Sequence, residues 1–179
     1  MKIATSRTRE QFPLSRKKIM KKSLPLTLLW SVCALGLTIG LITPIVSFET
    51  WKAGKGGSAV LIFAIAVVSS VLFFAITFAY QSWYYAVYFY ELDDNYIVIR
   101  KGPITPREIT IPYERVQDIH MDQDLLDRLF GLYDVHLSSA TISSGMEAHI
   151  DGVEREAAEG LRELILRKVN AKISSASNG

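Results

Sequence analysis

Three histidines and the acidic residues around them are the side chains of this 179-residue chain best suited to metal binding or acid–base chemistry. His120 lies between Asp118 and Asp122, and His136 and His149 follow. Imidazole and carboxylate groups serve as metal ligands and as general acids or bases. Their spacing matches no metal-ligand signature such as H-E-x-x-H, and neither a G-x-S-x-G elbow nor a Walker loop occurs. We therefore interpret the histidines as structural and expect no catalytic residue, no metal and no cofactor, with an enzyme that uses Asp118 and His120 as the alternative.

Two long apolar stretches, residues 24–48 and 59–80, contain no acidic residue, lysine, arginine or histidine. Each exceeds the roughly 20 residues that a helix needs to cross the hydrocarbon core of a membrane. The sequence therefore predicts two transmembrane helices joined by a short external loop, residues 49–58. Ion and proton transport normally requires ionisable groups inside the membrane, so transport by this chain alone is not expected.

Charge is unevenly distributed along the chain. Residues 1–23 carry eight lysines and arginines against one glutamate, whereas residues 81–179 carry ten basic and sixteen acidic residues. The loop carries two lysines, so the positive-inside rule predicts a protein of the cytoplasmic (inner) membrane with both termini in the cytoplasm. A cleaved signal peptide is disfavoured because the first apolar stretch is longer than the roughly 7–15 residues of the apolar region of a signal peptide. The acidic second half disfavours nucleic-acid binding.

Residues 81–172 are predicted to form one small cytoplasmic domain, preceded by a basic N-terminal segment, residues 1–23, and followed by a disordered tail, residues 173–179. Alternating apolar and polar residues predict antiparallel strands. Leucines at helical spacing predict a short helix that Gly131 ends. Asp151 and Glu154 are predicted to cap a final amphipathic helix that ends at Lys172. The expected strands are residues 84–90, 96–100, 107–111, 116–121, 134–138 and 147–151. The expected fold is a membrane helical hairpin followed by a curved antiparallel sheet or partly open barrel with one C-terminal helix.

The segments Ile111-Pro112-Tyr113-Glu114-Arg115-Val116-Gln117 and Leu126-x-Arg128-Leu129-Phe130-Gly131-Leu132 resemble the bacterial pleckstrin-homology (PH) domain of YdbS-like two-helix membrane proteins. The resemblance covers residues 20–170 and departs from the pattern at residues 144–146. It implies a PH-like barrel without catalytic activity and a role in membrane-associated scaffolding or envelope stress. The motif residues are interpreted mainly as structural, and Arg115 has Asp118, Asp122 and Asp127 as candidate ion-pair partners. These motif residues are Pro112, Arg115, Gln117, Arg128, Phe130 and Gly131.

The function expected from these observations is non-enzymatic presentation of the domain as a protein-interaction module at the membrane. The expected partners are membrane lipids and another membrane or cytoplasmic protein, including a sister PH-domain protein or a second copy of the chain. The alternative is recognition of anionic phospholipid headgroups by basic side chains. The candidate contacts for either interaction are Arg16, Lys17, Lys18, Lys21, Lys22, Arg100, Lys101 and Arg107.

Overall fold

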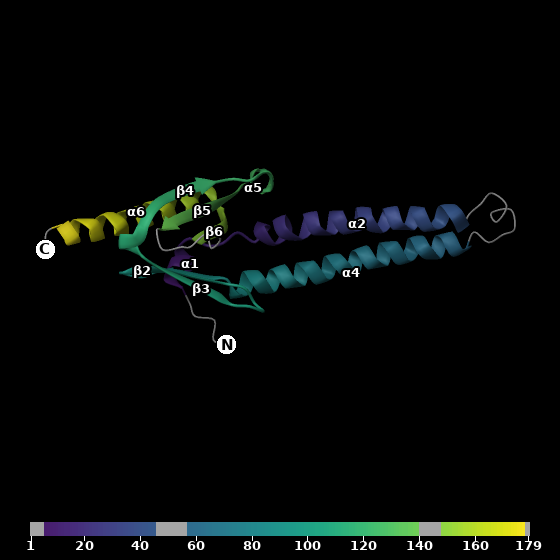
Figure 1. Cartoon of the computed structure of the whole chain (residues 1–179), viewed down its shortest axis with the longest axis horizontal. Helices are drawn as coiled ribbons and strands as arrows, with labels where there is room; N and C mark the ends of the chain where they lie inside the picture. The colour runs from purple at the N-terminus through teal and green to yellow at the C-terminus, as the bar shows by residue number, and fades with distance from the viewer. Residues whose placement is uncertain (1–5, 46–56, 140–147, 178–179) are drawn as a thin grey trace. The chain divides into compact units, whose positions relative to one another are not determined.

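The computed structural model describes residues 6–45, 57–139 and 148–177 (Figure 1). It divides into two compact units. Residues 22–82 form the first unit, which consists of two long apolar helices. The second unit, called the domain below, combines residues 1–21 with residues 83–179. The predicted boundary at residue 23 therefore differs from the observed organisation, because the basic N-terminal residues belong to the same compact unit as the C-terminal half.

The two long helices are α2, Lys17–Ile45, and α4, Gly57–Val87. Each contains a segment long and apolar enough to cross a membrane. Both extend beyond the predicted apolar stretches: α2 begins before residue 24 and α4 continues past residue 80. The rings of Trp30 and Phe73 stack with their centroids 4.8 Å apart, which joins the two helices. Of the predicted loop, residues 49–56 lie outside the described part of the chain.

The domain contains two three-stranded antiparallel sheets, ordered β1-β2-β3 and β4-β5-β6. Alternate residues of the strands are buried, as the sequence pattern predicts. The expected fold class is confirmed, and β2 to β5 lie within two residues of their predicted bounds. The strands are β1 (Phe89–Leu92), β2 (Tyr96–Lys101), β3 (Arg107–Pro112), β4 (Val116–Asp122), β5 (Leu132–Ser139) and β6 (Ala148–Glu154).

Three helical elements complete the C-terminal part of the domain. The 3-10 helix η1, Tyr113–Arg115, joins the two sheets. The short helix α5, Leu125–Phe130, ends at Gly131 as predicted, and the φ of 67° at this glycine is left-handed. Helix α6, Arg155–Ser177, contributes Ala158, Leu161, Ile165 and Val169 to a core shared with both sheets. One hydrophobic core therefore holds the two sheets and the final helix together.

Three expected boundaries differ from the structure. Residues 84–87 are helical, because α4 continues to Val87 before β1 begins. Asp151 does not cap α6, because it lies within β6, which stays paired with β5 as far as Glu154. Helix α6 continues to Ser177, past the predicted end at Lys172. The irregular residues 144–146 lie outside the described residues.

The first edge strand, β1, is covered by the N-terminal segment, defined here as residues 6–18. The segment includes the short helix α1, Arg7–Gln11, which packs against β1. The Ser6 hydroxyl donates to the Tyr90 carbonyl, and the Leu92 amide donates to Thr8 Oγ1 at 3.1 Å. Backbone groups at a sheet edge must find partners when they are buried. Side chains of the N-terminal segment provide those partners along β1.

The Arg9 side chain caps the end of α4. Its guanidinium donates to the Tyr88 carbonyl at 2.6 Å and to the Tyr85 carbonyl at 3.0 Å. The last carbonyls of a helix lack intrahelical partners, and the helix dipole favours a positive charge beside them. Arg9 therefore stabilises the point at which α4 ends and β1 begins.

The opposite edge strand, β6, pairs with the same N-terminal segment. Leu14 forms an isolated antiparallel bridge with Val153, and the Ser15 amide donates to the Gly152 carbonyl at 2.9 Å. The Tyr85 hydroxyl donates to the Leu14 carbonyl at 2.9 Å. Since β1 and β6 are the outer strands of different sheets, the N-terminal segment closes both sheets at once.

Replacing Gly160 of α6 with alanine is expected to destabilise the domain. Alanine normally stabilises a helix interior relative to glycine by about 0.5–1 kcal/mol. At Gly160, however, the added Cβ would overlap Cε1 of Phe12 in the N-terminal segment. We expect a lower Tm for Gly160→Ala, and no further loss when the same change is made in a Phe12→Ala background. Gly36→Ala is the matched control because nothing lies within 4 Å of an added Cβ there, and equal losses in both Phe12 backgrounds would contradict the explanation.

Candidate functional site

The three histidines align across the sheet β4-β5-β6. The strand register pairs His120 with His136 and His136 with His149. Their rings stack with centroid separations of 5.2 Å and 5.3 Å. Neighbouring residues such as Ile119 and Ile150 point into the core, so the histidines lie on the outer face of the sheet. The structure therefore brings together three residues that are separated in the sequence.

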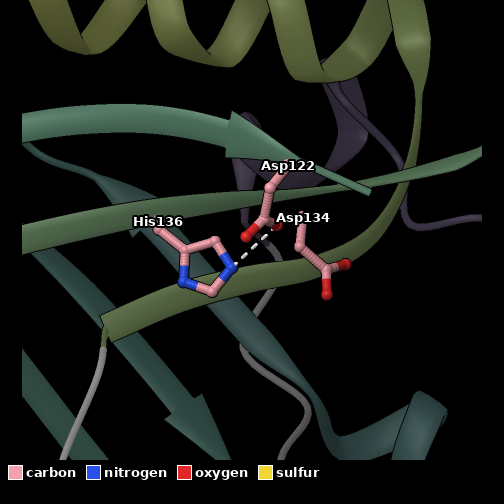
Figure 2. A group of neighbouring side chains, drawn as sticks. All are labelled: Asp122, Asp134 and His136. Carbon is pink, nitrogen blue, oxygen red and sulfur yellow. Dashed lines mark ion pairs between the residues drawn. The ribbon is translucent and has the colours of Figure 1, made fainter. Parts of the chain in front are cut away.

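Two aspartates lie beside the histidines on the outer face of the sheet: Asp122 is paired with Asp134 in the strand register. Asp151, on the third strand, is instead buried. Figure 2 shows the Asp122 carboxylate directed at His136, with Oδ1 3.1 Å from Nε2. One ligand atom each from Asp122, Asp134 and His136 lies within 4.8 Å of the others. These types of ligand could bind a divalent cation or share a proton.

Contacts already made within the domain engage these carboxylates. Asp122 Oδ1 lies 3.1 Å from His136 Nε2. Asp134 Oδ1 accepts a hydrogen bond from the Gly152 amide at 2.7 Å. Burial raises the pKa of the Asp134 carboxyl, and the nearby Asp151 charge acts in the same direction. The charges of Lys18 and Lys21 act in the opposite direction. A cation at Asp134 would have to compete with this hydrogen bond and with two nearby lysines.

Asp134→Asn is expected to stabilise the domain near neutral pH. An asparagine oxygen can still accept the Gly152 amide, while the charged form that burial disfavours is removed. A carboxyl whose pKa is raised on folding favours the folded state when it is protonated, and this contribution is lost as pH rises through the folded pKa. The Tm of the variant should therefore exceed that of the parent at pH 7, and the two should converge below about pH 4. Thermal melts from pH 3 to pH 8, with the exposed Asp118→Asn as control, test this result, and a variant less stable at pH 7 would contradict it.

A buried ion pair joins β6 to the beginning of α2. The Lys18 ammonium donates to Asp151 Oδ1 at 2.7 Å and to the Asp151 carbonyl at 3.0 Å. The two side chains are only 4% and 7% exposed. The ammonium also lies 4.1 Å from the centroid of the Tyr88 ring, where a cation–π interaction is favourable. Gly152 packs directly on this lysine, since an added Cβ would lie 2.6 Å from Lys18 Cδ.

A second lysine, one helical turn later, pairs with α5. The Lys21 ammonium lies 2.5 Å from Asp127 Oδ2 and 3.0 Å from Asp124 Oδ2. Asp127 is 1% exposed, and Asp124 and Asp127 also form the capping box of α5. Residues three apart in a helix share a face, so Lys18 and Lys21 fasten the first turns of α2 to two elements of the domain.

The other basic residues considered as contacts occupy two separate regions. Arg100 pairs with Glu108 at 2.6 Å, and the Lys101 ammonium lies 5.6 Å from the Tyr88 ring centroid. Lys101 and Arg107 are opposite one another in the register of β2 and β3. In the N-terminal segment, Lys17 pairs with Glu154 at 3.2 Å. Arg16 and Lys17 also line an open pocket of about 630 Å³ beside the start of α6, and Lys22 lies in α2.

The residues of the sequence motif lie around the β3–β4 corner and α5. Pro112 ends β3 and precedes η1, and Gln117 is exposed on β4. The expected partners of Arg115 are engaged elsewhere, because Asp118 contacts His120, Asp122 contacts His136 and Asp127 contacts Lys21. Arg128 is exposed and Phe130 half-buried in α5, directly before Gly131.

Sequence analysis missed Arg9 and Asp134 of this region. It assigned Asp127 and Asp151 to other roles, as a partner of Arg115 and as a helix cap, whereas they pair with Lys21 and Lys18. A basic segment before an apolar stretch is interpreted most simply as a topology signal, which hides its packing role. Two features of the sequence were compatible with that role. Lys18 and Lys21 have the spacing of one helix face, and the domain has an excess of acidic residues.

Two antiparallel sheets around one core, completed by a C-terminal helix, define a PH-like module. Residues 24–169 match the family model described as the bacterial PH domain, and the chain belongs to that family. The matched range includes both apolar helices but excludes the N-terminal segment. No curated protein and no solved structure gave a significant match. The YdbS-like subtype stays a prediction.

Proposed function

We propose that the protein resides in the cytoplasmic membrane through α2 and α4 and presents its PH-like domain to a protein partner in the cytoplasm, without catalysing a reaction. The partner class includes a sister PH-domain protein and a second copy of this chain, and the proposed setting is envelope-stress scaffolding. The family membership supports a PH-like module, and the two long apolar helices support residence in a membrane.

The main support for this proposal is that two segments from opposite ends of the sequence form the domain. Residues 1–21 and residues 83–179 fold into one compact unit, which is stabilised by the Lys18–Asp151 ion pair and by the Arg9 cap. Such a unit can form only if both segments lie on the same side of a membrane. Two crossings satisfy that condition, and the positive-inside rule places the shared side in the cytoplasm.

Protein binding is favoured over headgroup recognition by the state of the basic side chains. A headgroup site needs clustered lysines and arginines that are available to phosphate. Lys18 and Lys21 are instead buried against aspartates, and Arg100 is paired with Glu108. Fewer basic side chains of the N-terminal segment and the β2–β3 hairpin are therefore available to bind a headgroup phosphate than the sequence alone suggests.

Protease accessibility in inside-out and right-side-out vesicles tests the topology. Sites introduced near Ser6 and near Ser177 should both be cleaved only when the cytoplasmic face is outside. Cleavage of either site from the external face would contradict the proposed location.

Native mass spectrometry of the full-length protein in mild detergent tests the binding function. We expect a stoichiometric protein partner, or a dimer, in the spectrum of the unmodified chain. Stoichiometric anionic lipid that disappears in Arg107→Glu would instead support the headgroup alternative. Metal analysis of the same sample tests the alternative in which Asp118 and His120 belong to an enzyme.

A further inference from the structure

Helix α5 exposes two leucines to an unusual degree. Leu125 is 84% exposed and Leu129 is 76% exposed. They are four residues apart, so they lie on the same face of the helix. Single exposed leucines are common on protein surfaces, whereas a pair on one short helix forms a small apolar tip. We call Leu125 and Leu129 the leucine tip.

The helix that carries the leucine tip is held firmly at both ends. Asp124 and Asp127 form a reciprocal capping box at its start, and Gly131 ends it in the left-handed conformation. The Gln123 side chain donates to the Leu132 carbonyl at 2.7 Å and so fastens the two sides of the connection. These contacts fix the orientation of α5, and the two leucines are exposed in that orientation.

The position of the leucine tip follows from Lys21. This residue binds Asp124 and Asp127 at the start of α5, and the apolar stretch of α2 begins three residues later at Leu24. Three residues of helix advance the chain by about 4.5 Å. The tip therefore lies near Lys21, the residue at which the chain leaves the domain and continues into the first apolar stretch.

The opposite end of the domain is marked by other contacts. The Lys168 ammonium of α6 donates to the Asp93 carbonyl at 2.9 Å, and Lys172 contacts Asn95, both in the β1–β2 turn. Ile173 follows and is 57% exposed. Figure 1 shows α5 and the C-terminal end of α6 at opposite ends of the domain.

We propose that the leucine tip of α5 inserts into the interfacial layer of the cytoplasmic membrane and sets the domain against the lipid surface. The inference rests on the proposed residence of α2 and α4 in that membrane. An apolar helix face at the boundary between headgroups and acyl chains is buried by about 5–10 Å. Exposed Arg128 on the same helix can remain at the level of the headgroup phosphates.

Depth-dependent fluorescence quenching of the full-length protein tests this proposal. Cys33 is the only cysteine, so Leu129→Cys and Ile173→Cys can each be labelled with an environment-sensitive dye in a Cys33→Ala background. The proteins are reconstituted into phosphatidylethanolamine and phosphatidylglycerol liposomes that carry lipids with a doxyl group at acyl carbon 5 or 12. At position 129 we expect strong quenching by the shallow doxyl lipid and less by the deep one. At position 173 we expect quenching by neither lipid and full quenching by iodide in the outer solution.

Three further outcomes distinguish the ways in which the proposal could fail. The label on native Cys33 reports whether α2 lies in the bilayer, since this residue is in the apolar stretch of that helix. If the Cys33 label is quenched by doxyl lipids and the label at 129 is not, the insertion of α5 is wrong while the proposed membrane residence stands. If neither is quenched, the proposed residence itself fails. A label at 129 that is shielded from both doxyl lipid and iodide would show that a protein covers the tip, which also overturns the proposal.

Discussion

Lys18→Met is expected to cost the domain about 3–5 kcal/mol, because it removes one partner of a buried ion pair. The Lys18 ammonium binds both the side chain and the carbonyl of Asp151, and both side chains are almost completely buried. Desolvation of a carboxylate is tolerated only when an opposite charge and hydrogen bonds compensate for it. The exposed pair formed by Lys17 and Glu154 should contribute no more than about 1 kcal/mol.

Hydrogen exchange of the β6 amides in the full-length protein, followed by mass spectrometry, measures this loss. Since about 1.4 kcal/mol corresponds to a tenfold change, the slowest β6 amides should exchange about a hundredfold faster or more in Lys18→Met. Lys17→Met is the matched control one residue away. The double variant Lys18→Met with Asp151→Asn removes both charges and should recover most of the loss. Equal effects of the Lys17 and Lys18 variants would show that burial of the pair does not matter.

The strands and the short helix could be predicted because each depends on neighbouring residues. The alternation around Ile97 and Ile99 specifies β2, and the left-handed turn at Gly131 follows from the only residue type without a Cβ. The aromatic residues before β1 were misassigned because tyrosines suit a strand as well as a helix end. In the structure these residues continue α4, and the end of the helix is capped by the guanidinium of Arg9, which is 76 residues away from Tyr85 in the sequence.

The organisation of the site depends on pairings that no local pattern contains. Lys18 and Asp151 are 133 residues apart, and their contact requires the N-terminal segment to return to the domain after two long helices intervene. The alignment of His120, His136 and His149 likewise depends on strand register, which the sequence fixes only after the turns and bulges are known. The types of residue were therefore evident from the sequence, but their partners were not.

Deletion of residues 1–14 is expected to unfold the domain or convert it into an aggregating form, although the family match begins only at residue 24. The deletion removes the partners of the Tyr88 and Tyr90 carbonyls and of the Leu92 amide on β1. It also removes the bridge between Leu14 and Val153 on β6. Each buried polar group left without a partner costs about 1–3 kcal/mol, so the combined loss approaches the 5–15 kcal/mol total stability typical of a domain.

Limited proteolysis of membranes that contain the full-length or the truncated protein measures the effect. We expect rapid cleavage within β1 and β6 of the truncated form, because unpaired edge strands open and associate. A synthetic peptide of residues 1–14 should restore protection when it is added in excess, since it supplies the same edge contacts in trans. The matched peptide with Ser6→Ala and Arg9→Ala keeps the length and Leu14 but lacks the groups that bind Tyr90 and Tyr88, and it should protect poorly. A truncated protein that resists the protease as well as the parent would mean that the two sheets hold together without the N-terminal segment.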